Sequence, residues 1–411
     1  MRSYLFYVFL SEFILGYAVY TAFFQLQGLD PAQIGLLFAL WAGAGMVFEV
    51  PSGILSDRYD RRLLLALSPL LKALCFVVWA LVGAGTLTGA LWVFALGFLF
   101  WSAGSSLKTG TKEALLYERL RRDRCLRFYE RILGREQAMD TAGITLGAVL
   151  GGFVGQVSFT GALWLSVPPL VLAALVAVAL KDGRDRRSRP GADQGPGRGR
   201  LHSEASAYLR HLRQGLSAFK TRKELRLVAL YLAFGITCIG ALEEFDQLLY
   251  RALALPVWSF GLIMGSIGLC HMVASLTAHR LKAYPVLLWL LPLISGVGLL
   301  AFGLADRGST LAFYFLAYAA ITPLQVIATA RFQRAIGPNN DGDEDGESRA
   351  TTTSFLSLFM AATEIAFMLL FGLAMDKLGI LPAYQAAGLY LLGFAVWAFW
   401  RGRRATHRDR D

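Results

Sequence analysis

The chain has 411 residues, of which 55% are hydrophobic and 17% are charged, and its formal net charge is +11. Soluble domains are about 45–50% apolar even with glycine counted and about 25% charged, so the composition excludes an ordinary soluble domain and indicates that most of the chain lies in lipid. The basic residues are scattered between apolar runs, which favours the cytoplasmic flanks of membrane spans over a nucleic-acid surface.

Apolar segments long enough to cross a bilayer as helices, about 20 residues each, recur along the whole sequence. In the first half they are predicted at 4–25, 32–55, 63–84, 88–108, 132–156 and 160–180. In the second half they are predicted at 226–249, 256–279, 285–305, 309–333, 351–375 and 381–400. This pattern predicts an all-α membrane protein with twelve transmembrane helices in two six-helix bundles related by a pseudo-two-fold axis.

The predicted organisation has four parts: an N-terminal bundle over 1–180, a cytoplasmic linker over 181–225, a C-terminal bundle over 226–400 and a basic tail over 401–411. The linker begins as a Gly/Pro/Arg-rich stretch that is expected to be disordered. Its second part has apolar residues at helical spacing, which fits an amphipathic helix on the inner leaflet or a solvated linker helix.

The orientation follows from the positions of lysine and arginine. If the N-terminus is inside, 36 of the 40 Lys and Arg residues fall in inner segments, and outer loops hold only Arg251, Arg307 and Lys377. This asymmetry predicts that both termini are cytoplasmic. The chain is therefore expected to be an integral protein of the bacterial inner membrane.

A dense charge cluster, 53-GILSDRYDRR-62, lies between the second and third spans on the predicted inner side. It resembles the signature loop of the major facilitator superfamily, G-x-L-x-D-R-x-G-R-R. The matching positions are Gly53, Leu55, Asp57, Arg58, Arg61 and Arg62. Asp60 replaces the last glycine of the pattern, and because Asp tolerates a left-handed turn, the loop is still expected to close.

The resemblance implies a twelve-span secondary transporter whose signature loop latches the two halves together on the cytoplasmic side. A carboxylate favours a helix N-terminus, so Asp57 is expected to dock at the start of span eleven, after Arg349. The residues expected in this cytoplasmic gate are Glu49, Gly53, Asp57, Arg58, Arg61, Arg62, Glu113 and Asp140.

A glycine-rich motif in the fifth span resembles the antiporter motif of the same family, G-x-x-x-G-P-x-x-G-G. Its glycines are Gly143, Gly147, Gly151 and Gly152, with Ala148 in place of the proline. Small residues let helices approach closely, so ordinary helix packing explains the motif as well as a role in export. An arginine that accompanies efflux in the family's fourth span has no counterpart here.

Ionisable residues inside spans are costly and are functional candidates by default. Glu12 and Glu364 fall near mid-membrane and are expected to couple transport to protons or to contact substrate; a structural polar pair is the alternative. Three acids, Glu243, Glu244 and Asp246, lie in the outer third of span seven. His271 is a further titratable candidate, and Lys72 is expected to snorkel or pair.

The family resemblance implies a central cavity lined by spans one, four, seven and ten, with spans two, five, eight and eleven beside them. Aromatic and hydroxyl residues on those lining helices suit amphipathic or cationic organic molecules. They are Tyr17, Tyr20, Trp101, Tyr231 and Phe234. The predicted coupling and substrate site consists of Tyr17, Trp101, Tyr231, Glu12, Glu364, Glu244, Asp246 and His271.

Several motifs that would indicate other chemistry fail. The acidic stretch 341–347 imitates a calcium loop, but Thr352 stands where a bidentate Glu is required; a flexible acidic loop is the expectation. No nucleotide-binding loop or zinc-protease motif occurs, and the four cysteines have no metal-site spacing. No metal, cofactor, nucleic-acid partner or enzymatic activity is expected.

These observations predict a secondary transporter that exports small organic compounds in exchange for protons. Uptake or facilitated diffusion of a metabolite is the alternative, and a non-transporting sensor or scaffold is an alternative of another class. The expected partners are the lipid bilayer, a small-molecule substrate and protons. The sequence leaves the substrate and the oligomeric state open.

Overall fold

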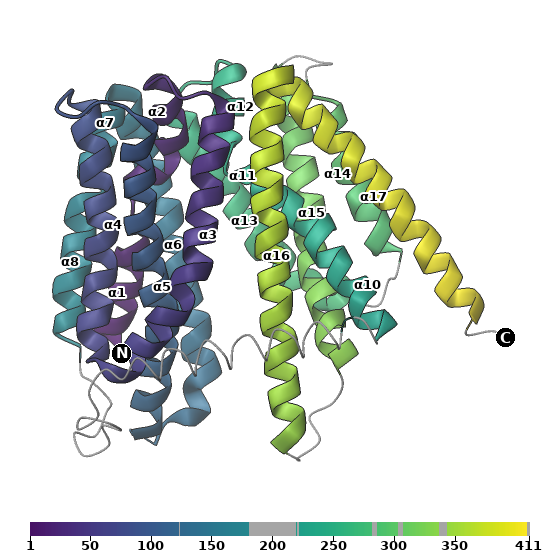
Figure 1. Cartoon of the computed structure of the whole chain (residues 1–411), viewed down its shortest axis with the longest axis horizontal. Helices are drawn as coiled ribbons and strands as arrows, with labels where there is room; N and C mark the ends of the chain where they lie inside the picture. Colours follow the sequence, from purple (N-terminus) through teal and green to yellow (C-terminus); the bar gives the residue numbers. More distant parts are fainter. Residues whose placement is uncertain are drawn as a thin grey trace. The chain divides into compact units, whose positions relative to one another are not determined.

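The computed structural model describes residues 1–122, 124–180, 219, 222–281, 286–302, 307–336 and 343–408. Within these ranges every regular element is a helix. Ten of the helices described there are long and apolar enough to cross a membrane, and two shorter apolar helices occupy Trp258–Cys270 and Leu287–Leu300. The all-α fold is confirmed, and the helices fall at the twelve expected spans (Figure 1).

The chain divides into two compact units. Unit 1 comprises Met1–Gly197 with Ala254–Ser266, and unit 2 comprises Arg198–Leu253 with Ile267–Asp411. Most of the predicted linker, including its expected amphipathic helix, lies outside the described residues. Each unit is considered by itself below.

Unit 1 is an antiparallel helical bundle whose interior is rich in aromatic side chains. Its helices are α1 Arg2–Glu12, η1 Leu15–Ala18, α2 Tyr20–Leu26, α3 Pro31–Arg58, α4 Arg61–Gly83, α5 Leu91–Arg122, η2 Leu126–Phe128, α6 Tyr129–Val157, α7 Phe159–Leu165, α8 Val167–Val178 and the start of α13 Trp258–Leu281. In lipid the hydrophobic effect does not drive helices to associate, so such bundles are stabilised by close van der Waals packing. Trp79 of α4 is fully buried, and its indole lies directly against Gly97 of α5.

The starts of α3 and α4 show how the sequence sets helix boundaries. Asp30 and Gln33 form a reciprocal capping box at the start of α3, with Pro31 in the first turn. Asp60 caps α4 by accepting a hydrogen bond from the backbone N–H of Arg62 at 2.9 Å. Asp60 has φ −63° and ψ 118°, so no left-handed turn is needed here: the position serves as an N-cap, a role that Asp performs well.

Unit 2 contains α10 Lys223–Tyr231, η4 Leu232–Ile236, α11 Thr237–Glu243, α12 Asp246–Ala252, the remainder of α13, α14 Leu287–Leu300, α15 Arg307–Ile336, α16 Asp343–Leu378 and α17 Ile380–Arg408. η4 is a π-helical turn. α16 begins at Asp343, before the expected start at 351. Residues 343–347 of the expected acidic loop are therefore helical, and residues 351–354 lie inside the helix rather than at its N-terminus.

The first membrane-crossing segment of each unit is interrupted. In unit 1, α1 ends at Glu12 and the chain continues as η1 and α2. In unit 2, α10 passes through η4 into α11, and α12 starts only at Asp246. Interrupted helices in corresponding positions of two repeats point to a binding region in transporters, so these segments define the candidate site.

Candidate functional site

The interruption after α1 places irregular backbone deep inside unit 1. Ile14 has φ −119° and ψ 112°, which ends the helical ladder. The backbone N–H of Gly16 donates to the Oγ of Ser166, on the neighbouring helix pair, at 2.8 Å. Non-helical backbone at membrane depth is tolerated only where protein or water satisfies it, and Ser166 provides part of that satisfaction.

The glycine motif of α6 packs directly on this interruption. A Cβ added at Gly143 would lie 2.5 Å from the carbonyl oxygen of Phe9, and one at Gly147 would lie 2.7 Å from the backbone nitrogen of Ile14. At Gly151 an added Cβ would overlap the carbonyl of Leu15. Only glycine fits at these contacts, so α6 holds the backbone of α1 and η1 at close range.

The same helix meets the beginning of α13 through small residues. A Cβ at Gly152 would lie 2.9 Å from the carbonyl oxygen of Trp258, and Gly261 lies against the backbone of Ala148. The alanine that replaces the family's proline therefore sits at a close helix contact. This contact explains why Ala254–Ser266 belongs to unit 1.

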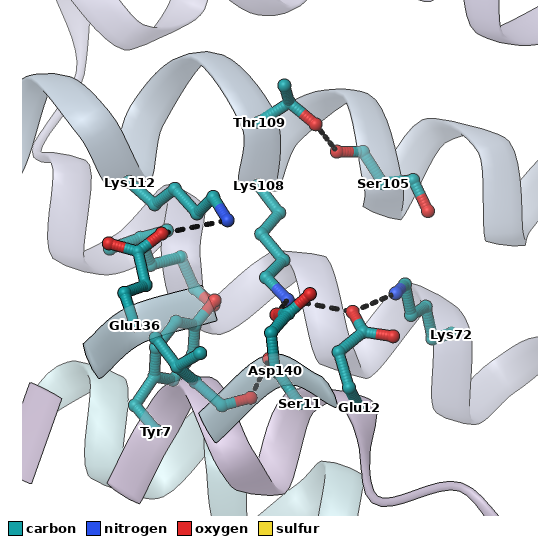
Figure 2. A network of polar contacts seen from close by, with 12 residues as sticks. Tyr7, Ser11, Glu12, Lys72, Ser105, Lys108, Thr109, Lys112, Glu136 and Asp140 are labelled. Carbon is teal, nitrogen blue, oxygen red and sulfur yellow. Dashed lines mark hydrogen bonds and ion pairs between the residues drawn. The ribbon is translucent and has the colours of Figure 1, made fainter. Parts of the chain in front are cut away.

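Glu12, the last residue of α1, is the centre of a buried charge network (Figure 2). Its Oε1 accepts from the Nζ of Lys72 at 2.8 Å and from the Nζ of Lys108 at 2.7 Å. Its Oε2 accepts from the hydroxyl of Tyr17 at 2.6 Å, across the interruption. Lys108 also donates to Asp140 of α6 at 3.0 Å. We call these five residues the Glu12 network.

The network balances two carboxylates against two ammonium groups, and Glu12, Lys72 and Lys108 are each less than 10% exposed. Buried charges cost several kcal/mol each unless they are paired and hydrogen-bonded. Protonating Glu12 would leave two buried ammonium groups facing one carboxylate. The arrangement therefore ties α1, α4, α5 and α6 together as an electrically neutral unit.

Two further ion pairs involve α5 and lie beyond the network. Glu136 accepts from the hydroxyl of Tyr4 at 2.6 Å and pairs with Lys112 at 2.9 Å. Arg61 of the signature loop is buried and lies 2.7 Å from Glu118 of α5. Both pairs join the C-terminal half of α5 to a neighbouring helix, Lys112 to α6 and Glu118 to α4.

The other predicted gate residues are more open. Glu49, Gly53, Arg58 and Glu113 are exposed. The side chain of Asp57 lies outside the described ones, so its docking remains a prediction, although the helix terminus proposed for it begins instead at Asp343. Arg62 pairs with Asp60 at 2.7 Å, and Asp140 joins the Glu12 network.

Unit 2 holds its central carboxylate in a different way. Asp246 is buried, and its Oδ2 accepts from Tyr314 at 2.5 Å. Its Oδ1 accepts from Tyr318 at 2.8 Å and Tyr384 at 2.9 Å. The hydroxyl of Tyr250 lies 2.6 Å from that of Tyr314. Phenol donors rather than ammonium groups surround this carboxylate, and they link α12 to α15 and α17.

Glu364 lies near the middle of α16 and is half-buried. Among the described residues it makes neither a hydrogen bond nor an ion pair, and Glu244 is the charged group that interacts with it electrostatically. Glu243 interacts with the same acids. Among the described residues between 227 and 400, lysine and arginine lie near helix ends.

The remaining predicted residues have packing roles or cannot be placed. Trp101 is buried, and its ring centroid lies 5.4 Å from that of Tyr17. Tyr231 donates to the carbonyl of Leu288 and packs on Phe394. The side chain of His271 lies outside the described ones. Across the described part of the chain, no group of three or more His, Cys, Asp or Glu side chains is arranged to hold a metal ion.

Sequence reasoning misses the role of Lys108 and of the tyrosines around Asp246. The apolar run of the fourth span ends at Lys108, but α5 continues to Arg122 and buries it. The sequence does hold part of the evidence for this network: Lys72 lies within a predicted span, and a cation inside the membrane requires a nearby carboxylate. Tyr314, Tyr318 and Tyr384 carry no such signal, because tyrosines in spans more often pack or anchor at the interface.

Comparison with known proteins identifies the fold's relatives. The sequence model of the Major Facilitator Superfamily matches residues 4–342. No curated protein sequence matches the chain. Among solved structures, a bacterial homolog of the human lysosomal transporter Spinster, inward-facing and unoccupied, has a TM-score of 0.70 at 16% identity, covering 97% of this chain and 96% of that one.

Two other solved structures share the same architecture. A point mutant of the nucleoside transporter NupG has a TM-score of 0.66 at 16% identity, covering 98% of both chains. A D-xylose-proton symporter has a TM-score of 0.65 at 13% identity, covering 97% of both chains. At these identities the likeness concerns the fold.

Proposed function

The chain belongs to the major facilitator superfamily, a family of membrane transporters, and we propose that it exports small organic compounds by alternating access in exchange for protons. The observation that carries the proposal is that the first helix of each unit is interrupted beside a buried carboxylate, Glu12 in one and Asp246 in the other. Interrupted helices at such positions serve substrate and ion binding in transporters. We place the protein in a bacterial inner membrane with both termini cytoplasmic.

Proton coupling requires a carboxylate whose charge is not already balanced. Lys72 and Lys108 balance Glu12, so its role is structural: it fixes the interruption of the first helix. Glu364 has no cationic partner among the described residues and lies at mid-membrane depth, where an ionisable group is a functional candidate. We therefore assign coupling to Glu364, with Glu244 beside it, rather than to Glu12.

The acidic character of unit 2 also supports a substrate class. Four carboxylates, Glu243, Glu244, Asp246 and Glu364, interact electrostatically within one unit. Proton export cycles exchange a cationic or amphipathic compound for protons at such carboxylates. The aromatic pair of Tyr17 and Trp101 in unit 1 suits the apolar part of such a compound.

Uptake of a metabolite is the second candidate. Ala148 replaces the proline of the antiporter motif, which removes part of the support for export. A nucleoside transporter and a D-xylose-proton symporter share the fold. Transport direction therefore has to be measured.

The test is reconstitution of the purified full chain in liposomes with an imposed pH gradient and a panel of organic cations, amphipathic compounds, nucleosides and sugars. We expect a cation or amphipathic compound to evoke proton flux and to be moved against its gradient in the export direction. The matched pair is Glu364→Gln, which should lose the flux, and Glu224→Gln, at an exposed position before the span, which should keep it. Transport of every active compound without proton movement would contradict coupling.

A further inference from the structure

A basic hairpin joins α5 to α6 at the end of unit 1 where the N-terminus also lies (Figure 1). We call residues 119–122 and 124–135 the arginine hairpin. Residues 119–135 of the sequence contain seven arginines and two acids. Six of the arginines are exposed: Arg121, Arg122, Arg124, Arg127, Arg131 and Arg135.

Apolar side chains are exposed among these arginines. Tyr117 is 46% exposed, Phe128 is 37% exposed and Leu133 is 38% exposed. The guanidinium of Arg127 lies 4.8 Å from the centre of the Phe128 ring. A surface that mixes arginines with exposed aromatic and aliphatic groups fits the boundary between headgroups and acyl chains, where both kinds of group are satisfied.

The length of α5 places the hairpin on the headgroup side of the hydrocarbon core. The helix has 32 residues, so it is about 48 Å long at 1.5 Å per residue. The hydrocarbon core is about 30 Å thick, so about 18 Å of α5 extends beyond it, and the last turns pass through the headgroup region. Positive-inside counting puts this end on the cytoplasmic side, where anionic lipids are attracted to basic segments.

We propose that the arginine hairpin is a binding surface for the phosphate groups of anionic phospholipids in the cytoplasmic leaflet. Arginine presents a planar fork of donors that matches phosphate oxygens. Tyr117, Phe128 and Leu133 pack among the headgroups of the same lipids. A soluble acidic segment would match the charge but would leave these apolar groups in water, which favours the lipid as the occupant.

The arginine hairpin connects the two helices that hold several of the paired charged side chains of unit 1. α5 holds Lys108 and Lys112, and α6 holds Glu136 and Asp140. Lipid bound at the hairpin therefore stabilises the packing of α5 against α6 next to the Glu12 network. Lipid binding here requires only that unit 1 crosses the membrane, so it is independent of the proposed substrate and of proton coupling.

The experiment measures lipid selectivity directly. Purified full chain is placed in phosphatidylcholine membranes, and the association of spin-labelled phosphatidylglycerol is compared with that of spin-labelled phosphatidylcholine. One basic residue near the surface contributes about 1 kcal/mol, or about fivefold in affinity, so a lipid that contacts even one of these arginines should show a preference of at least about fivefold for phosphatidylglycerol. The preference should fall as salt is raised, since charge attraction at a surface is screened.

Matched variants separate this surface from general positive charge. The neutralising variant carries Arg121→Gln, Arg124→Gln, Arg127→Gln and Arg131→Gln, and should lose most of the preference. Lysine at the same four positions should retain part of it. A control that neutralises exposed Arg2 and Arg401 should retain all of it. Labelling of Cys125 with an impermeant maleimide in inside-out vesicles checks that the hairpin of each variant remains cytoplasmic.

Two outcomes would overturn the proposal. One is equal association of the two spin-labelled lipids with the unmodified protein. The other is an unchanged lipid preference in the neutralising variant together with loss of binding to a soluble acidic peptide, which would make the hairpin a protein-binding surface.

Discussion

The Nζ of Lys108 lies 2.7 Å from the Oε1 of Glu12. This ion pair joins the last residue of α1 to the middle of α5, at the point where the first helix is interrupted. The pair does not stand alone, since Lys72 shares the same carboxylate oxygen. Its energetic meaning therefore depends on the charge balance of the whole network.

A double-mutant cycle tests that balance. Glu12→Gln leaves the network with an excess positive charge, and Lys72→Met leaves an excess negative one, so each single change should lower stability by about 3–5 kcal/mol. The double variant restores neutrality, with Lys108 still paired to Asp140. Its loss should be smaller than the sum by about 0.5–3 kcal/mol, measured by thermal denaturation in detergent. Simple additivity of the two losses would contradict a shared network.

Gly151→Ala tests the contact between α6 and the interruption. The new methyl group would overlap the carbonyl of Leu15, so the variant should lose stability and transport. Gly134→Ala is the control on the same helix, because nothing lies within 4 Å of a Cβ there, and alanine is a better helix former than glycine. The measurements are thermal midpoint and substrate flux. If both variants keep the thermal midpoint and the substrate flux of the unmodified protein, the contact between Gly151 and Leu15 does not stabilise the structure.

The Asp246 cluster predicts a graded series. Asp246→Asn keeps the Oδ1 acceptor for Tyr318 and Tyr384, and its amide can donate to Tyr314, so the loss should be small. Asp246→Ala removes the acceptor from three buried phenols and should cost more, because each unsatisfied buried group costs about 1–3 kcal/mol. Tyr384→Phe removes one bond and should fall between them. Thermal denaturation in detergent orders the three, and a reversed order would contradict the assigned hydrogen bonds.

Asp60 gives a prediction for the signature loop. Because its side chain caps α4, Asp60→Ala should lower stability by about 1 kcal/mol, whereas Asp60→Gly, which restores the family pattern, should cost only a few tenths. Arg62 loses its carboxylate partner in both. The comparison of thermal midpoints distinguishes capping from a loop-closing role, for which glycine would be the better residue.

The sequence was sufficient for the fold because apolar length and the distribution of arginine report directly on membrane crossing. It was not sufficient for the interruption at Phe13–Val19, since those residues are as apolar as their neighbours and the glycines of α6 that pack on them lie far away in the sequence. The burial and pairing of Lys108 could not be predicted, because the apolar run of the fourth span ends at this residue although α5 continues beyond it. Glu12 and its two lysine partners lie on three different helices, so residue spacing along one helix cannot predict their pairing.

We assign a structural role to Glu12 and proton coupling to Glu364. One measurement tests the assignment of coupling to Glu364 most directly. In liposomes, Glu364→Gln should abolish accumulation driven by a pH gradient while retaining exchange of labelled for unlabelled substrate, because exchange needs no net proton movement. If Glu364→Gln still accumulates substrate in response to the pH gradient, the assignment of coupling to this residue is wrong.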